Sequence, residues 1–414
     1  MEISYRQLSP SEALKLYCDW LMEQEVEGAA PFLKCYENGE QRYEWYMIFY
    51  SLRTLMLGGK VLNEKRYSEA TIKYMDNYIS EQLPNGGFTS NYRQTPTEKL
   101  SKKEFHEILR SGKVNIADAG SNVLGLIQAL SFLDAGKKKK YIEAVRRWFD
   151  DWAAIWQLKD GCGNGIWVGH KLNSAYTMAM ANISSAYSAF GIVTGEYEYI
   201  ENAERLMAFQ ATQWLPDGRP LNLSCYPLPG VNIVEDYSRI FYLLEGMCWT
   251  HFASKNKEVK DAIAKRLKEW IFGEMGILSQ WRSSWFNFNC TAQPPAAMQN
   301  TSVNFDSIYN KSPQRNPADD IPSSRLGIRL GWELAKSNGI IHALQYYLDN
   351  IDDNLVLREK VDLGIKFLSH PLKSRMSGVA SESEESYGAF AVQATGFAGL
   401  SLAQAVKKNI VFEL

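Results

Sequence analysis

The feature of this sequence that most constrains the fold is a regular alternation of short and long connections between helical segments. Apolar residues recur at helical spacing in nearly every ordered stretch, and we find no two period-2 runs joined by a tight hairpin signal. The chain is therefore predicted to be mainly helical. If helical hairpins stand side by side in a ring, all the tight turns lie on one face and all the long loops on the opposite face.

The alternation predicts about six helical hairpins, each with a tight turn at one end and a long loop at the other. The expected pairs are 40–58 with 65–83, 119–134 with 138–157, 173–193 with 197–213, 236–253 with 257–273, 325–337 with 340–369 through a turn at 337–339, and 386–407 with 10–27. The first helix of most pairs is rich in Ala, Gly and Ser. Small residues suit a crowded inner wall, where helix backbones approach one another closely.

We therefore predict an all-α protein, an (α/α)6 toroid, in which residues 1–414 form a single domain. An open helical solenoid is the alternative architecture. It would need polar capping units at its two ends, and none stands out in the sequence.

Composition and charge exclude several classes of partner. The formal net charge of −2 provides no single-sign field, so we expect neither nucleic acid nor a membrane surface as a partner. No stretch reaches the roughly 18 continuous apolar residues of a spanning helix and no leader pattern is present, so we expect a soluble, cytoplasmic protein. The 6 cysteines form no CxxC or Cys/His cluster, and no cofactor motif is found, so we expect reduced thiols, no metal and no cofactor.

Three long loops begin with a related phrase. The three segments, which begin with Gln and turn at Gly, are Gln82–Phe88, Gln157–Trp167 and Gln213–Arg219. We expect these phrases to end an outer helix and to return the chain into the ring, which is a structural rather than a chemical use.

The segment Gly165-Ile-Trp-Val168 precedes a helix of small residues and then Thr194-Gly-Glu-Tyr197. This arrangement resembles the unsaturated glucuronyl and rhamnogalacturonyl hydrolases of the six-hairpin glycosidase group, and Glu385-Ser-Tyr-Gly-Ala-Phe390 is similar to the last inner helix of that group. The resemblance implies the toroid fold and activity on carbohydrates. In that group a catalytic aspartate directly follows the GIWV-type stretch, whereas Gly169 and His170 stand here, so the resemblance does not extend to that group's hydration chemistry.

Two aspartates at the starts of expected inner helices are candidate catalytic acids. Asp118 lies in Asn115-Ile-Ala-Asp-Ala-Gly-Ser-Asn122, and Asp236 lies beside Tyr237 and Arg239. A glycosidase needs two carboxyl groups that flank one bond, but an Asp at a helix start also serves simply as a cap. Tyr237 and Arg239 could bind the hydroxyls or carboxylate of a sugar.

Other candidates come from the long loops themselves. His170 would project near the mouth beside Trp167, as a general base or a sugar contact. Trp281 and Trp285 lie among asparagines in the longest loop, 274–324, and aromatic rings beside amides are typical of sugar-binding surfaces. We expect the remaining histidines to have structural roles in outer-helix or tight-turn positions; they are His106, His251, His342 and His370.

These residues favour a carbohydrate-active enzyme whose substrate is a small molecule or oligosaccharide. The simplest form is a glycoside hydrolase that uses Asp118 and Asp236, with His170 and the aromatic residues in its subsites. A polysaccharide lyase or sugar epimerase would rely instead on His170, Tyr237 and Arg239. An isoprenoid cyclase and a non-catalytic glycan-binding protein are further alternatives, although the nearest acidic cluster, Asp349–Asp353, lacks a cyclase motif.

Overall fold

The computed structural model describes the ring of helices and part of the loops on one of its faces. The described residues are 7–23, 35–37, 40–42, 45–92, 99–167, 174–216, 218–223, 233–234, 237–274, 276–278, 339–369 and 388–414.

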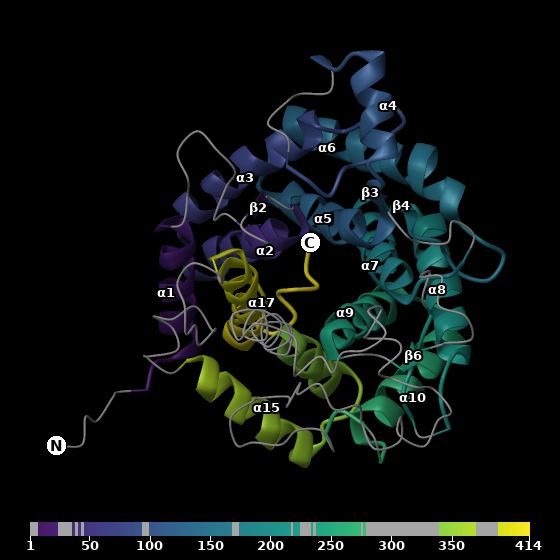
Figure 1. Ribbon diagram of the computed structural model, residues 1–414. Coiled ribbons are helices and arrows are strands. Elements are labelled where there is room, and N and C mark those ends of the chain that lie inside the picture. The colour runs from purple at the N-terminus through teal and green to yellow at the C-terminus, as the bar shows by residue number, and fades with distance from the viewer. Residues whose placement is uncertain are drawn as a thin grey trace, which may run out of the picture.

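The helices form two concentric rings (Figure 1). The inner ring consists of α2 (Trp45–Leu62), α5 (Ile116–Ala129), α7 (Thr177–Thr194), α9 (Tyr237–Ala253), a helix that spans 339–350, and α17 (Gly388–Val406). The outer ring consists of α3 (Lys65–Ser80), α6 (Ala135–Arg147), α8 (Tyr197–Thr212), α10 (Lys257–Phe272), α15 (Leu355–Leu368) and α1 (Pro10–Glu23). Helix α17 packs on α2 as closely as α5 packs on α7, which closes the ring. The predicted (α/α) toroid is confirmed.

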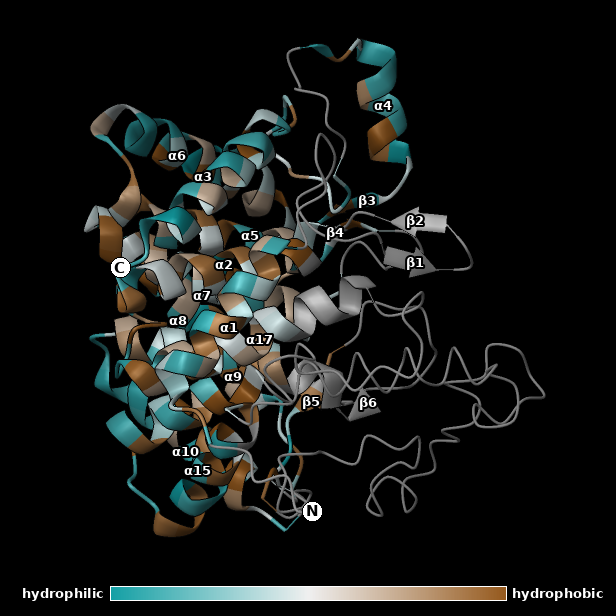
Figure 2. Cartoon of the chain, turned by 90° about the vertical axis from the view of Figure 1, so that its left-hand side faces the viewer, coloured by the Kyte–Doolittle hydropathy of each residue, from teal (hydrophilic) through white to brown (hydrophobic). Residues whose placement is uncertain are grey.

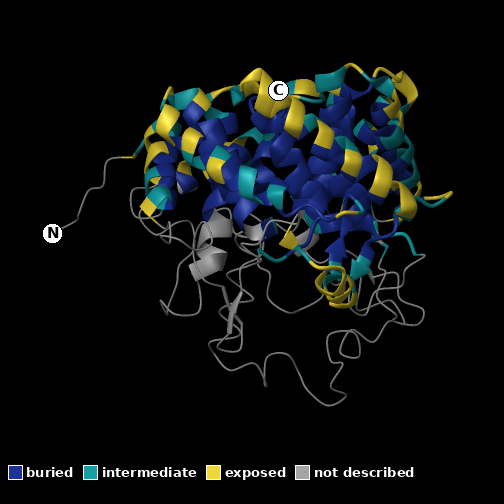
Figure 3. Ribbon diagram, turned by 90° about the horizontal axis from the view of Figure 1, so that it is seen from above, coloured by how far each residue is buried: buried dark blue, intermediate teal, exposed yellow. Residues whose placement is uncertain are grey.

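Small residues let the inner helices approach one another. A Cβ atom added to Gly246 of α9 would lie 2.6 Å from the Ala181 carbonyl oxygen of α7, and one added to Gly120 of α5 would lie 2.9 Å from the backbone of Asn182. Buried residues fill the interior of the ring, whereas the exposed residues lie on its outside (Figure 3). The small-residue pattern in the sequence therefore identified the inner wall correctly.

One predicted hairpin is wrong. Gly339 was expected in a turn at 337–339, but it lies in the inner helix 339–350, and the tight connection to α15 is at 351–354. Asn354 ends this connection, and its side chain accepts a hydrogen bond from the Leu357 backbone amide at 3.1 Å. The glycine serves packing instead, because a Cβ atom at Gly339 would lie 2.6 Å from the ring of Phe241.

The described loop segments contain three short ladders and one extra helix, and the ladder of β3 with β4 and the helix α4 lie on the same side of the ring (Figure 2). The paired strands are β1 (Cys35–Glu37) with β2 (Glu40–Arg42), β3 (Lys113–Asn115) with β4 (Gly165–Trp167), and β5 (Leu221–Asn222) with β6 (Ile233–Val234). The extra helix, α4 (Lys102–Arg110), begins with a capping box between Ser101 and Glu104. None of these elements was predicted, although Asn38-Gly39 between β1 and β2 is a common hairpin signal.

The three Gln–Gly phrases form equivalent turns after outer helices, as predicted. The Leu83 amide donates to the Gly87 carbonyl at 2.8 Å, and Leu158 and Leu215 make the corresponding bonds to Gly161 at 3.0 Å and Arg219 at 2.7 Å. The second turn follows α6 through a π-helix (Trp148–Trp152) and a 3₁₀ turn (Ala153–Trp156). Gly86, Gly161 and Gly218 all have positive φ angles, which explains why each phrase contains glycine.

We expect Gly86→Ala to destabilise the protein more than Gly195→Ala. Both glycines have positive φ, of 82° and 75°, so alanine would be strained at either position. At Gly86 the added Cβ atom would also lie 2.6 Å from the Arg147 carbonyl oxygen, whereas at Gly195 nothing lies within 4 Å. Urea denaturation should show a loss of about 1 kcal/mol for Gly195→Ala and ~2–4 kcal/mol for Gly86→Ala. Equal losses would show that the close contact at Gly86 relaxes freely.

The C-terminal segment closes the ring on the face opposite the long loops (Figures 1 and 2). Ile410, Val411 and Phe412 are all fully buried. The Val411 carbonyl oxygen accepts a hydrogen bond from the Gln128 side chain of α5 at 2.7 Å. The Phe412 ring packs against the rings of Trp249 and Tyr346, with centroids 5.2 Å and 4.6 Å apart. This segment therefore covers the interior of the ring at its tight-turn end.

Candidate functional site

Asp118 differs from the other residues of its helix in its exposure to solvent. Helix α5 buries every one of its residues except Asp118, which is partly exposed at the long-loop end. The sequence placed this aspartate just before the helix, as a cap or a catalytic acid. The structure places it in the first turn, and Asn115 occupies the cap position.

Other groups satisfy the first backbone amides of α5. The Asn115 side-chain oxygen accepts from the Asp118 amide at 2.7 Å. Asn164, from the loop that leads into β4, accepts from Ile116 through its carbonyl at 2.9 Å and from Ala117 through its side-chain oxygen at 3.0 Å. Because Asn115 occupies the cap position and Asn164 satisfies the two amides before Asp118, the helix does not depend on Asp118 as its N-cap residue.

The Asp118 carboxylate is held by two donors. Its Oδ2 atom accepts from the Ser90 hydroxyl at 2.8 Å and from the Asn115 amide nitrogen at 2.7 Å. Ser90 is itself fixed, because its amide donates to the Lys113 carbonyl at 2.9 Å and its carbonyl accepts from the Trp45 amide at 2.8 Å. Two donors and the positive end of the α5 dipole favour the ionised carboxylate.

Trp167 belongs to the ladder that also carries Asn115. It pairs with Lys113 in the β3–β4 ladder, two positions from the pair of Asn115 with Gly165. Since alternate residues of a strand point to the same side, Trp167 shares a face of the ladder with Asn115, which holds Asp118. The ladder thus joins the segment that carries Trp167 to the segment that carries Asp118.

The remaining predicted site residues are only partly covered. Asp236, His170, Trp281 and Trp285 lie outside the described residues. Tyr237 and Arg239 belong to the first turn of α9, and the structure describes the course of that helix but not these side chains.

Sequence reasoning missed the aromatic support beneath Asp118. The Tyr78 ring stacks on Phe88 at 4.3 Å and meets the edge of Trp45 at 5.0 Å. Its hydroxyl accepts from the Asn122 side chain at 3.1 Å. Burial raises the pKa of Tyr78 well above its ordinary value, and the charge of Asp118 raises it further, so the phenol stays neutral. The only sequence signal was the Gln82–Phe88 phrase, which ends two residues before Ser90.

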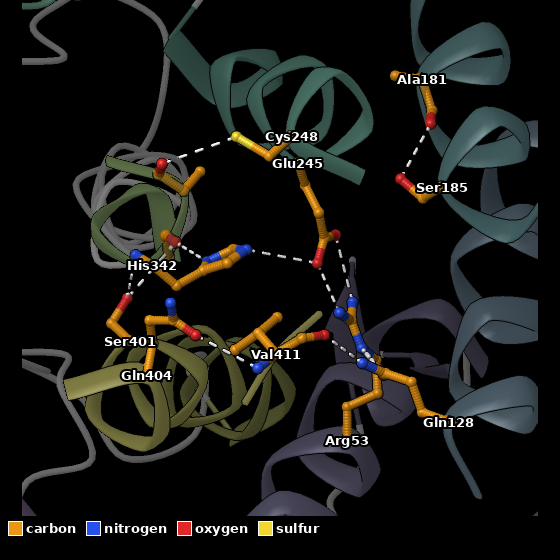
Figure 4. A network of polar contacts seen from close by, with 12 residues as sticks. Arg53, Gln128, Ala181, Ser185, Glu245, Cys248, His342, Ser401, Gln404 and Val411 are labelled. Atoms are coloured by element: carbon orange, nitrogen blue, oxygen red, sulfur yellow. Dashed lines mark hydrogen bonds and ion pairs between the residues drawn. The ribbon is translucent and has the colours of Figure 1, made fainter. Parts of the chain in front are cut away.

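Deeper in the ring, an ion pair crosses the axis (Figure 4). Arg53 of α2 and Glu245 of α9 come from opposite sides of the inner ring, and they are 0% and 2% exposed. Two hydrogen bonds of 3.2 and 2.5 Å join them, and the Arg53 Nε atom also donates to Gln128 at 2.8 Å. Burial opposes the charge of Glu245, but Arg53 and His342 outweigh burial and lower the pKa of this carboxyl to about 2. The ion pair is therefore a buried polar group inside the inner ring, between α2 and α9.

The four histidines that were predicted to lie on outer helices or at tight turns agree with that prediction only in part. His342 was expected on an outer helix or a tight turn, but it lies on the inner wall, with its Nε2 atom 3.4 Å from a Glu245 oxygen. The reason is that helix 339–350, which carries it, belongs to the inner ring. His106 lies on α4, on the long-loop face, and not at a tight turn. His251 has the expected structural role, since its Nδ1 atom lies 2.8 Å from the Tyr346 hydroxyl. His370 lies outside the described residues.

The acidic cluster that comes nearest to a cyclase signature lies on the tight-turn side of the ring. Asp352 and Asp353 belong to the tight connection before α15, where they pair with Lys268 at 3.2 Å and Arg358 at 2.6 Å. Within the described ranges, no group of three or more His, Cys, Asp or Glu side chains is arranged to hold a metal ion. Among the helices of those ranges, none is long and apolar enough to cross a membrane.

No protein-family model and no curated protein sequence matches the chain. Solved structures match nearly all of it. A GH76 alpha-mannanase of Bacteroides thetaiotaomicron aligns with a TM-score of 0.63 at 13% identity, covering 96% of each chain. A family 88 glycosyl hydrolase of Bacteroides vulgatus aligns with a TM-score of 0.56 at 11% identity, covering 95% of this chain and 99% of that chain. The fold is that of the six-hairpin glycosidases.

The same toroid also occurs in enzymes with other chemistry. A sugar epimerase from a ruminal bacterium aligns with a TM-score of 0.57 at 10% identity, covering 86% of this chain and 85% of that chain. The likeness therefore confirms the six-hairpin fold expected from the Gly165–Val168 stretch, while identities this low leave the chemistry to be argued from the site.

Proposed function

We propose that this chain is a glycoside hydrolase that cleaves an oligosaccharide at the mouth of the toroid. One observation carries the proposal: Asp118 is the one residue of α5 that is not buried, and its carboxylate is held by Ser90 and Asn115 although the helix is capped by other groups. A partly exposed, oriented carboxylate on which the helix does not depend as its N-cap residue suits catalysis at an opening.

The hydrogen bonds around Asp118 favour a particular role. Because both donors and the helix N-terminus stabilise its ionised form, Asp118 is assigned as the base or nucleophile rather than the proton donor. A second carboxyl group must then protonate the leaving oxygen. We assign that role to Asp236, which directly precedes α9 in the sequence. His170, Tyr237, Arg239, Trp281 and Trp285 remain proposed substrate contacts.

The substrate class follows from the aromatic side chain and from the structural neighbours. Trp167, in the ladder that also carries Asn115, offers a flat apolar surface on which a sugar ring can stack. Structures of a mannanase of Salegentibacter sp. with the same fold are described in complex with α-1,6-mannotetrose and α-1,6-mannotriose. Oligosaccharides of α-linked mannose are therefore the first substrates to test.

A lyase or epimerase is the second candidate, because an ionised Asp118 could equally remove a proton from a sugar carbon. A polysaccharide lyase aligns with this chain at a TM-score of 0.56 and 11% identity. Chemistry of that kind needs a neighbour that neutralises the developing charge, and Arg239 is the proposed group.

The full chain should be incubated with α-1,6-mannotriose, α-1,6-mannotetraose and uronic-acid oligosaccharides, with products read by mass and by reducing-end assay. New reducing ends with the mass of added water are the expected result. An unsaturated uronide product would assign a lyase, and an isomer of unchanged mass would assign an epimerase. Binding without turnover would contradict catalysis and leave a glycan-binding protein.

A further inference from the structure

Ser90 and Asn115 form a closed triangle of hydrogen bonds with the carboxylate of Asp118. The Asn115 Nδ2 atom donates to the Ser90 Oγ atom at 2.7 Å and to the Asp118 Oδ2 atom at 2.7 Å. The Ser90 hydroxyl donates to the same Oδ2 atom at 2.8 Å. Ser90 and Asn115 are each only 2% exposed, so two buried side chains hold a partly exposed acid.

A backbone amide fixes the direction of every hydrogen bond in this triangle. The Asp118 amide can only donate, and it donates to the Asn115 side chain at 2.7 Å, so the atom that it meets is the side-chain oxygen of Asn115. The Asn115 nitrogen therefore faces Ser90, and it too can only donate. The Ser90 oxygen accepts that bond, so its single proton points to Asp118. A proton that bound to Oδ2 of Asp118 would have to displace one of the two donors.

The position of the Ser90 hydroxyl does not depend on a bound ligand. The Ser90 amide donates to the Lys113 carbonyl at 2.9 Å, and the Ser90 carbonyl accepts from the Trp45 amide at 2.8 Å. Because the backbone is bonded on both sides, the hydroxyl is oriented before a substrate arrives. Hydrogen bonds that reach the charged form of a carboxylate lower its affinity for a proton.

We propose that Ser90 is a positioning residue, which keeps Oδ2 of Asp118 as a hydrogen-bond acceptor and so directs the reaction to the other carboxylate oxygen, Oδ1. The proposal rests on the catalytic role proposed above for Asp118. As a base, Oδ1 takes one proton from a water molecule whose oxygen bonds to the anomeric carbon, while the leaving oxygen takes a proton from the second carboxyl group. As a nucleophile, Oδ1 itself bonds to the anomeric carbon and the leaving oxygen is protonated in the same way.

The kinetic test compares Ser90→Ala with a matched control, Ser121→Ala. Ser121 is 3% exposed and also bonds to Asp118, but its hydroxyl donates to the backbone carbonyl at 2.9 Å and not to the carboxylate. The pH dependence of kcat/KM should be measured on the oligosaccharide that the wild type turns over best. Ser90→Ala is expected to move the acid limb of this profile up by about one pH unit and to lower kcat about tenfold with little change in KM. Ser121→Ala and the hydroxyl-retaining Ser90→Thr are expected to keep the acid limb of the wild type.

The triangle can also be tested without a substrate. Urea denaturation of the wild type, Ser90→Ala, Asp118→Asn and the double variant gives the coupling between the two side chains. Because the bond from Ser90 favours the ionised carboxylate, its contribution to stability is present at pH 7 and is lost as the pH falls through the range in which Asp118 takes up a proton. The coupling is therefore expected to be larger at pH 7 than at pH 3.

An acid limb that stays in place in Ser90→Ala, or that moves equally in Ser121→Ala, would overturn the positioning role, while the turnover of the wild type would still support the hydrolase. A coupling that is the same at both pH values would also overturn it, because Ser90 would then not bond to the charged carboxylate. If the wild type cleaves none of the saccharides, the proposed function fails and the positioning role fails with it, even where the coupling depends on pH.

Discussion

Replacing Asp118 with asparagine is expected to lower kcat/KM by roughly 10²–10⁴-fold on the best oligosaccharide substrate, since asparagine cannot act as a base or nucleophile. The folded state should change little, because the first amides of α5 are satisfied by Asn115 and Asn164 and not by the Asp118 side chain. We expect the free energy of unfolding to fall by less than about 1 kcal/mol. Steady-state kinetics and urea denaturation of the same preparation measure both quantities.

Asp134→Asn is the matched control. Asp134 is a true helix cap, since its Oδ1 atom accepts from the Lys137 amide at 2.9 Å at the start of α6. It lies on the tight-turn side of the ring, and asparagine caps a helix about as well as aspartate, so this change should cost little stability and no activity. An Asp118→Asn protein with undiminished turnover would remove Asp118 from the mechanism, whatever the substrate proves to be.

The largest loss of stability is expected for Glu245→Gln. This change leaves the Arg53 guanidinium buried without a counter-charge, which typically costs ~3–5 kcal/mol. The double variant Arg53→Met with Glu245→Leu should recover most of this loss, because it removes both charges and keeps apolar volume. Asp261→Asn, in an exposed pair with Lys257 of 2.5 Å, should change stability by less than about 1 kcal/mol. If the double variant is no more stable than Glu245→Gln, the buried charge is not the cause of the loss.

The same ion pair predicts a pH dependence. The pKa of Glu245 is lowered from 4.5 in the unfolded chain to about 2 in the folded protein. The unfolded state therefore takes up a proton first as the pH falls. The stability that Glu245 contributes is fully present above pH 4.5, and it is lost as the pH falls from 4.5 towards 2, by about 3 kcal/mol. Denaturation curves of Glu245→Gln should lack this component.

The helices that could be predicted from the sequence are those whose ends carry local signals. Residues 197–213 were expected as an outer helix and α8 spans Tyr197–Thr212, because Gly195 ends α7 just before it. The prediction of the fifth hairpin was wrong because Gly339 resembles a turn residue. The structure shows that a glycine is needed there to leave room for the Phe241 ring. The ladders were missed because strands of two or three residues are too short to show a period.

The site was predicted only in part for a related reason. Asp118 and Trp167 could be named as candidates because each stands next to a local motif in the sequence. The supports of Asp118 could not, since Ser90 lies 28 residues before it and gives no local signal of its role. Arg53 and Glu245 are 192 residues apart, and no local pattern could have paired an arginine in one helix with a glutamate three inner helices further along the chain.

That separation has a kinetic consequence. Arg53 and Glu245 lie 192 positions apart in the chain, so we expect their contact to form late, once the intervening helices have assembled. An interaction that is absent from the folding transition state leaves the folding rate unchanged and lowers the unfolding rate. We therefore expect the ion pair between Arg53 and Glu245 to slow the unfolding of the closed ring rather than to speed its formation.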